Sequence, residues 1–283
     1  MNNYGMTNEE FSNAFDTLLN SFKHKSEFGN QSSLADVTID EYEKSFFLTQ
    51  AQDNIVKSYF TRSLNPNGEG FDDSTRRQMD FSTLITVKSI DVSSATKTGG
   101  FSDNGYTVSF KDSDFTVGST LAYPLFIINE RITTMEVNTP ADGDTPAVYK
   151  PAGSYVIVPL NYKEYDRMMS RAYSEPLKRQ AWRLFESSSS DLSRQAEIIL
   201  RTDATPPDKY IIRYVRRPIP IVLVDLTNTD NKLTIDGGAT TVKPCELNPI
   251  VHQEILQEAV RLALASNGIE TRDQRAAREA AQG

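Results

Sequence analysis

The stretch that most constrains this chain runs from Leu34 to Ser63 and has the periodicity of one long helix. Thr38 is a favourable N-cap, and Glu41 three residues later predicts a capping box. Apolar residues recur at helical spacing, at Leu48, Ala51, Ile55 and Tyr59. The proline and glycine of the following turn end the pattern. We therefore expect a helix over residues 38–63, about 40 Å long at ~1.5 Å per residue, on which the rest of the chain is mounted.

Two more segments have helical periodicity, near residues 7–24 and 248–266. In the first, Thr7 and Glu10 predict another capping box. Its apolar face comprises Phe11, Phe15, Leu18 and Phe22. In the second, Asn248 and Pro249 form a favourable helix start. Its apolar face comprises Ile255, Leu256, Ala259, Leu262 and Ala263. Together with the long helix, these segments predict a helical core.

From Phe81 the spacing of apolar residues changes from helical to alternating. Tyr106, Val108 and Phe110 alternate with polar residues, and Asn104-Gly105 is a favoured hairpin dipeptide. Short strands separated by polar turns are typical of an antiparallel sandwich or barrel. The predicted fold class is therefore α+β, with a helical core and an antiparallel β-sandwich or barrel-like insertion over residues 81–160.

Beyond residue 160 the sequence predicts helix, strand and helix again. Asn161 and Glu164 predict a helix start, and the apolar residues of 177–185 form a second short segment. Lys209 to Leu226 is strongly strand-like, but its prolines predict two strands meeting at a kink, or an edge strand. We expect four parts, namely an N-terminal helical part (1–64), the β region (81–160), a part that packs with the N-terminal helices (161–268) and a C-terminal tail (269–283).

The composition restricts the possible functions. Hydrophobic residues make up 38% of the chain, which favours a protein that has extended parts or completes its core against partners. The formal net charge of −8 argues against general affinity for nucleic acid. The N-terminus has no secretory signal pattern, and no stretch approaches the ~18 apolar residues of a membrane span. We expect no membrane association.

The usual signatures of catalysis are missing from the sequence. There is neither a phosphate-binding glycine motif nor a GxSxG element. Of the two histidines, His24 at the end of the first helix is expected to be structural, and His252 to lie at an interface or in solvent. Cys245 precedes a helix start, which could lower its pKa, but no base is evident. The acidic pairs Asp40/Glu41 and Asp72/Asp73 are interpreted as caps and solvated loops. We predict no catalytic, cofactor or metal site, and no enzyme.

Basic residues cluster in two places. Arg213, Arg216 and Arg217 interleave with Tyr210 and Tyr214, a pattern that can bind single-stranded nucleic acid but is more typical of the outward face of a strand. The second cluster lies in the tail and comprises Arg272, Arg275 and Arg278. A solvated end and a segment that docks on a partner are equally compatible with this second pattern.

Three blocks, taken in order, resemble a virion structural protein of crAss-like short-tailed bacteriophages. The first is EYEKSFFLTQAQDNIVKSYF at residues 41–60. The second is VIVPLNYKEYDRMMSRAYSEPLKRQAWRL at 156–184, followed by KYIIRYVRRPIPIVL at 209–223. The third is CELNPIVHQEILQEAVRLALA at 245–265. The resemblance covers about a third of the chain and leaves out residues 81–150.

The resemblance implies a homo-oligomeric ring at the junction of portal and tail. Such a head-to-tail connector would be twelvefold, to match the portal, and would line part of the channel through which DNA is ejected. Its implied partners are the portal protein, adjacent tail or ring proteins, and genomic DNA that passes without specific binding. It would be assembled in the host cytoplasm and reside in the virion. The tail arginines Arg272, Arg275 and Arg278 would then dock on the portal.

Two alternatives from other functional classes remain open at this point. The β region can be a carbohydrate- or receptor-binding module at the tail periphery, although Trp182, the one tryptophan, lies outside it. The strand at 209–217 can bind single-stranded nucleic acid, although the net charge disfavours this function.

Overall fold

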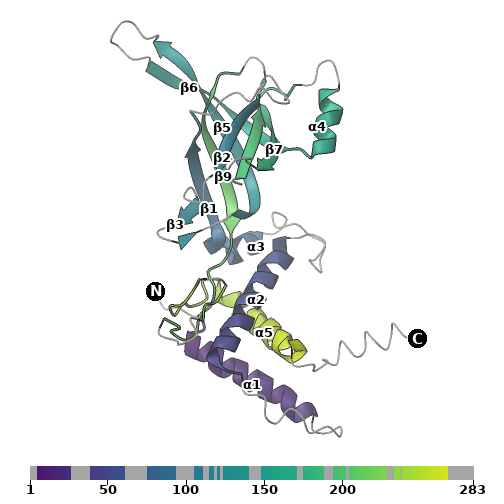
Figure 1. Ribbon diagram of the computed structural model, residues 1–283, viewed down its shortest axis with the longest axis vertical. Helices are drawn as coiled ribbons and strands as arrows, with labels where there is room; N and C mark the ends of the chain where they lie inside the picture. Colours follow the sequence, from purple (N-terminus) through teal and green to yellow (C-terminus); the bar gives the residue numbers. More distant parts are fainter. Residues whose placement is uncertain are drawn as a thin grey trace, which may run out of the picture. The chain divides into compact units, whose positions relative to one another are not determined.

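The chain divides into two compact units. The computed structural model describes residues 5–26, 39–60, 75–93, 105–110, 115–117, 120–121, 124–139, 148–170, 175–187, 194–201, 204–227, 233–236 and 238–266. Met1–Leu84 and Pro218–Gly283 form one unit, which we call the helical unit. Ile85–Arg217 form the other, the sheet unit (Figure 1). Along the sequence, the segment that forms the sheet unit therefore lies between the two segments that form the helical unit.

Helices occupy the three predicted regions, with bounds that differ from the prediction. The helical unit contains α1 (Asn8–Ser26), α2 (Glu41–Phe60), α3 (Thr75–Asp80) and α5 (His252–Ser266), with short 3-10 turns η2 (Ser82–Leu84) and η4 (Pro249–Val251). The central helix α2 has 20 residues, so it spans roughly 30 Å at 1.5 Å per residue and is shorter than predicted. It packs mainly against α5, and α1 packs against α5 as well. No helix in the described ranges is long and apolar enough to cross a bilayer.

The start of α2 differs from the prediction. The cap is Asp40, whose Oδ1 accepts a hydrogen bond from Glu43 N at 2.7 Å, while Glu43 Oε2 accepts from Asp40 N at 3.4 Å. Thr38 lies outside the described residues. Glu41, predicted as its partner, instead accepts a hydrogen bond from Ser12 Oγ at 2.6 Å. The capping box predicted for α1 is formed, because Glu10 N donates to the Thr7 hydroxyl and Thr7 N to the Glu10 carboxylate.

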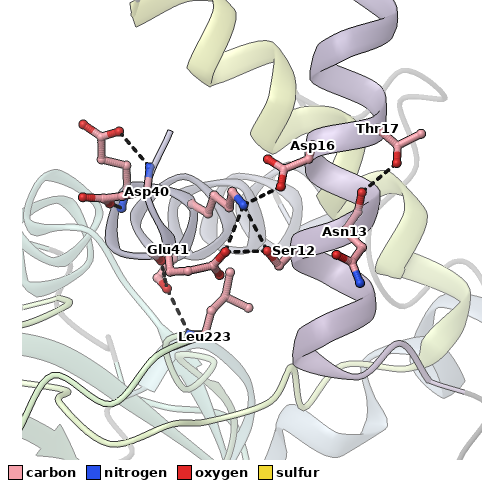
Figure 2. Close-up of polar contacts among 10 residues, drawn as sticks. Ser12, Asn13, Asp16, Thr17, Asp40, Glu41 and Leu223 are labelled. Atoms are coloured by element: carbon pink, nitrogen blue, oxygen red, sulfur yellow. Dashed lines mark hydrogen bonds and ion pairs between the residues drawn. The ribbon is translucent and has the colours of Figure 1, made fainter. Parts of the chain in front are cut away.

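A buried lysine, Lys44, joins α2 to α1 through Ser12, Asp16 and Glu41, the three partners labelled in Figure 2. Lys44 Nζ lies 2.7 Å from Asp16 Oδ2 and 3.0 Å from both Glu41 Oε1 and Ser12 Oγ. Burial alone would lower the pKa of Lys44, but its hydrogen bonds to the two carboxylates outweigh this effect and raise the pKa. The ammonium therefore stays charged although the side chain is buried, and it fixes the pairing of the two helices.

A row of polar side chains on α2 holds an extended segment, residues 219–223. Thr49 Oγ1 accepts a hydrogen bond from Ile221 N at 3.1 Å and donates to Ile221 O at 3.2 Å. Gln52 Nε2 donates to Ile219 O at 2.8 Å. Ser45 Oγ accepts from Leu223 N at 3.0 Å (Figure 2). Side chains of α2 thus make the hydrogen bonds that the backbone of a neighbouring strand would make in a sheet.

The other edge of the same segment is also paired. Val222 and Lys243 exchange two backbone hydrogen bonds of 3.0 Å, and Asn8 Nδ2 donates to Val222 O. Ile219 N donates to Glu246 Oε1 at 2.6 Å. The interruption predicted within 209–226 is therefore confirmed, because the sheet strand ends at Arg216. The segment beyond Pro218 belongs to the helical unit and does not form a second strand of the sheet. Prolines lack the N–H that a central sheet strand needs.

The apolar core of the helical unit is formed by the inward faces of the three long helices. Its buried members include Phe11, Phe15, Leu19, Leu48, Ala51, Ile55, Val56, Phe81, Leu84, Ile221, Leu247, Ile255, Leu256, Ala259, Val260, Ala263 and Leu264. Most of the predicted apolar positions are among them. His252 is also buried, with 3% of its surface exposed, so the expectation that it lies at an interface or in solvent is wrong.

His252 anchors the N-terminal segment to α5. Its Nδ1 accepts a hydrogen bond from Met6 N at 3.1 Å, which leaves Nε2 to donate to Leu247 O at 3.0 Å. The imidazole also packs against the ring of Phe11, at a centroid distance of 5.2 Å. Burial lowers its pKa below the usual 6.5, although the bond to the Leu247 carbonyl acts in the opposite direction. The folded protein therefore holds this side chain neutral.

The sheet unit contains one seven-stranded sheet that curls around a core (Figure 1). Its strands are β1 (Ile85–Asp91), β2 (Gly105–Phe110), β5 (Pro124–Thr139), β6 (Val148–Pro159), β7 (Gln180–Ser187), β8 (Arg194–Ile199) and β9 (Pro207–Arg216), in the order β1-β9-β5-β6-β7-β8-β2. All neighbours are antiparallel except β6 and β7. The short strands β3 (Thr116–Val117) and β4 (Thr120–Leu121) pair with each other. The α+β class is confirmed. The described strands form a curled sheet and this hairpin, rather than the two packed sheets of a sandwich.

Residues 161–217 were predicted to pack with the N-terminal helices, but they belong to the sheet unit. Helix α4 (Tyr162–Met169) has the capping box predicted from Asn161 and Glu164. The apolar segment at 177–185 contains most of β7, which pairs with β6 and β8. The reason is that β7 and β9 each find strand partners inside residues 85–217, so their backbone hydrogen bonds are satisfied within the sheet.

The sheet buries residues on both faces. The concave face carries the larger core, which comprises Val92, Tyr106, Val108, Phe115, Ile132, Ile157, Ala181, Ala196, Ile198, Leu200, Tyr210, Ile212 and Tyr214. On the convex face, Tyr165 of α4 packs against Trp182, Leu184 and Ile199. Helix α4 therefore covers the convex face at β7 and β8.

The polar row of α2 predicts a specific stability change. Substitution Thr49→Val keeps the side-chain volume but leaves the buried N–H and carbonyl of Ile221 without their partner. We expect the free energy of unfolding to fall by about 1–3 kcal/mol, measured by urea denaturation. Thr17→Val on the exposed face of α1 removes a hydroxyl bond to Asn13 and should change stability by less than about 0.5 kcal/mol. Equal effects of the two substitutions would contradict the structural role of Thr49.

The buried histidine predicts a pH dependence of stability. Below about pH 6.5, His252 becomes protonated in the unfolded chain but stays neutral in the folded protein. The free energy of unfolding therefore decreases as the pH falls from 6.5 toward the lowered pKa of the folded state. The loss is at most about 1.4 kcal/mol per pH unit for one site. Urea denaturation between pH 5 and 7.5 should give a steeper fall for wild type than for His252→Gln. Parallel curves would show that His252 is not held neutral.

Candidate functional site

A buried polar cluster lies on the concave face of the sheet. Arg183 Nε lies 2.8 Å from Glu130 Oε2, and both side chains are less than a tenth exposed. The hydroxyl of Tyr210 donates a short hydrogen bond to Glu130 Oε1. Each charge therefore has a partner, as a buried ion pair requires. We call these three residues the sheet triad.

The sheet triad ties together strands that are not all neighbours. Glu130 lies on β5 and Arg183 on β7, with β6 between them, while Tyr210 lies on β9 beside β5. The ion pair thus crosses one strand, including the parallel junction of β6 and β7. Sequence reasoning missed this cluster. Its members are 27 to 80 positions apart along the chain, so no local spacing links them.

The three side chains of the sheet triad bind one another and play a structural role. Burial, then the charge and the hydrogen bond of Glu130, raise the pKa of Tyr210, so its hydroxyl remains protonated and acts as a donor. The guanidinium of Arg183 lies 3.7 Å from the ring centroid of Phe185, which adds a cation–π contact. Each group is committed to a partner inside the sheet, and this arrangement favours a role in holding its curvature.

The arginine–tyrosine pattern of β9 follows from strand alternation. Tyr210 and Tyr214 are fully buried on the concave face, whereas Arg213 points outward and is exposed. Bases stack on exposed aromatic rings, so neither tyrosine offers the platform that the nucleic-acid alternative needs. The interpretation of this cluster as the outward face of a strand is confirmed for Arg213, whereas the two tyrosines face the core.

Trp182 is equally unavailable as a sugar-binding platform. It lies on β7, inside the sheet unit, with 7% of its surface exposed. Its ring packs with Tyr165 of α4 in the smaller apolar cluster. The carbohydrate-binding alternative gains no support from this residue.

Cys245 carries a partly buried thiol that is not activated. Its Sγ lies 3.3 Å from Gln52 Oε1 and donates to it. Burial raises the pKa of the thiol to about 12, so the lowered pKa expected from a helix start is wrong. Among the described residues, no group of three or more His, Cys, Asp or Glu side chains is arranged to hold a metal ion.

The remaining site residues predicted from the sequence lie in the tail. Arg272, Arg275 and Arg278 lie outside the described residues, as do Asp72 and Asp73. Of the acidic residues interpreted as caps, Asp40 does cap α2.

Large apolar side chains are exposed on each unit. In the helical unit these include Phe46, Met79, Val224, Val242 and Ile250, and in the sheet unit Val87, Val156, Tyr162, Leu177 and Phe185. Exposed apolar surface is a feature of proteins that bind other proteins. Both units thus leave apolar side chains in water that contacts with other proteins could cover.

Comparison with known sequences identifies the family. The family described as phage tail ring protein 3/4 matches residues 6–275 of this chain, and the chain belongs to that family. It is 40% identical to "Ring protein 4/5" of Bacteroides phage crAss001 over 261 residues, which are 92% of this chain and 93% of the relative. It is 32% identical to "Ring protein 3" of the same phage over 262 residues, or 92% and 96% of the two chains. The match includes the sheet region at 81–150, which the resemblance of the three sequence blocks left out.

The sheet triad predicts the outcome of single and paired substitutions. Arg183→Leu leaves the carboxylate of Glu130 buried without its ion-pair partner, and we expect a loss of about 3–5 kcal/mol in the free energy of unfolding. Glu130→Leu combined with Arg183→Leu removes both charges and should restore most of this loss. Arg213→Leu, at an exposed position of the same sheet, is the matched control. The coupling would be refuted if the double variant were as unstable as the sum of the single ones, measured by urea denaturation.

Proposed function

We propose that this protein forms a ring at the head-to-tail junction of a crAss-like phage and connects the portal to the tail. The observation that carries the proposal is the 40% identity, over nearly the whole chain, to a phage protein named for its ring. Subunits of a ring act by binding their neighbours and need no reacting group. An enzymatic role is not part of the proposal.

The ring is proposed to be homo-oligomeric and twelvefold, to match the symmetry expected for the portal. A ring requires heterologous contacts, in which one surface of a subunit binds a different surface of the next. Both units display exposed apolar side chains, such as Val242 in one and Val156 in the other, each about half exposed. These side chains are available for such contacts and for adjacent tail or ring proteins.

The ring is further proposed to line part of the channel through which the genome is ejected. DNA must slide through such a channel without being held. The formal net charge of −8 and the burial of Tyr210 and Tyr214 are compatible with passage without specific binding. A lumen lined by acidic side chains would repel the phosphate backbone.

The C-terminal tail is proposed to dock on the portal through Arg272, Arg275 and Arg278. The proposal comes from their place beyond the last described helix and from their spacing of three residues, which puts them on one face if the tail is helical. Assembly would take place in the host cytoplasm and the mature location would be the virion.

Co-assembly with the portal protein tests this function. The full chain and the purified portal of the same phage, mixed and imaged by negative-stain electron microscopy, should give a portal that carries an additional ring. Deletion of residues 269–283 should abolish this docking and leave the thermal unfolding of the chain unchanged. A chain that never binds the portal or a neighbouring ring protein would refute the connector role, whereas undiminished binding of the truncated chain would refute only the tail assignment.

A further inference from the structure

The convex face of the sheet has an uncovered half with a mixed basic and apolar surface. In the strand register, Arg213 of β9 lies between Val87 of β1 and Asn129 of β5. Arg131 of β5 lies between Ile211 of β9 and Val156 of β6. Residues directly opposite on neighbouring strands share a face and lie about 5 Å apart. These six residues therefore form one continuous surface across β1, β9, β5 and β6, which we call the basic face.

Two observations set the basic face apart from ordinary sheet surface. Val87 is 53% exposed and Val156 49%, so apolar area is left in water at two of its sides. Arg131 and Arg213 are exposed, and within the described residues neither takes part in an ion pair. Helix α4 packs on the convex face at β7 and β8, away from Val87 and Arg213 on β1 and β9. Arginine is enriched in protein interfaces, and the fully buried centre of an interface is more apolar than the rest of a protein surface.

The chain itself carries a surface of opposite charge. The sheet unit contains 17 Lys and Arg against 16 Asp and Glu, a formal charge of +1. The helical unit contains 13 against 22, a charge of −9, and the two together give −8. Exposed carboxylates lie at the start of α2, in Asp40 and Glu43, and in Asp225. Tyr42 packs against the apolar cluster of Leu226, which brings the start of α2 close to Asp225.

We propose that the basic face of one copy binds the acidic surface formed by Asp40, Glu43 and Asp225 on the helical unit of the next copy. Val224, 37% exposed beside Asp225, provides apolar area on the acidic side to match Val87 and Val156. The two surfaces are different, so the contact is heterologous and repeats from copy to copy until a ring closes. This inference rests on the ring function proposed above and names the surfaces that join its subunits.

Charge complementarity gives this contact a direction. Guanidinium groups pair with carboxylates in a planar, two-pronged geometry, which favours Arg131 and Arg213 as the positions that set the register of the contact. Like charges on two acidic helical units disfavour their direct association. The sheet unit of one copy is thus directed to the helical unit of its neighbour.

Cross-linking in assembled particles tests the proposal directly. Lys209 lies on the same face as Arg213 and opposite Asp91 and Thr133, at the margin of the basic face. A carbodiimide joins a lysine amine directly to a carboxylate that touches it. Virions are treated with it, cross-linked dimers of this chain are separated on a denaturing gel, and the joined peptides are identified by mass spectrometry. We expect Lys209 joined to Asp40, Glu43 or Asp225 of another copy.

A charge swap provides the second test. Portal-nucleated assembly of the full chain is followed with the double variant Arg131→Glu/Arg213→Glu, which should weaken ring formation by at least about tenfold. Glu43→Lys/Asp225→Lys should have a similar effect, and a mixture of the two variants should recover assembly. The control Lys163→Glu/Arg167→Glu makes the same change in net charge at exposed positions of α4 and should assemble like wild type.

The outcomes separate this inference from the function on which it rests. Two results would overturn the inference and leave the ring function intact. In the first, the chain is in the particle but the interchain cross-links of its lysines join other surfaces. In the second, the mixture of the two charge-swapped variants fails to restore assembly although both variants unfold at the wild-type temperature. If the chain is absent from the particle, the proposed function fails as well.

Discussion

The helical unit depends on the way in which α2 satisfies the backbone of residues 219–223. Pro218 and Pro220 flank Ile219 at the start of this segment and leave it unsuited to a central sheet strand. Thr49 and Gln52 pair with its backbone from one side, and Lys243 pairs with Val222 from the other. Each buried backbone group left without such a partner would cost about 1–3 kcal/mol. The polar row is therefore what lets the chain return from the sheet unit and complete the helical core.

In the sheet unit, buried polar groups are satisfied by an ion pair. This ion pair between Glu130 and Arg183 crosses β6, and the Tyr210 hydroxyl donates to Glu130, so these three polar groups inside the curl are paired with one another. Each unit thus has a core of its own within the described residues. The modest hydrophobic content does not mean that neighbours must supply a missing core. Association is left to exposed surfaces, which suits subunits that fold first and assemble afterwards.

Local signals in the sequence were enough for part of this fold. Helix starts at Thr7 and Asn161 depend on residues three positions apart, and both were predicted. The start of α2 was not, because Asp40 competes as cap and Lys44 recruits Glu41. Strand β7 was not predicted as a strand, because side chains are buried on both faces of the sheet there and the apolar residues do not alternate with polar ones. Trp182 and Leu184 pack under α4, and Arg183 forms an ion pair with Glu130 on the other face. Contacts between residues distant in sequence decided both cases, and one sequence does not display them. The same limit applied to the sheet triad.

The central claim is that identical copies of this chain close into a ring at the neck of the phage particle. Electron cryo-microscopy of intact virions, with a focused reconstruction of the region between portal and tail, measures this directly. We expect density that fits the helical unit and the sheet unit as separate bodies, repeated around the channel, with the sheet of each copy against the helical unit of the next. A neck in which no ring accommodates this chain would contradict it.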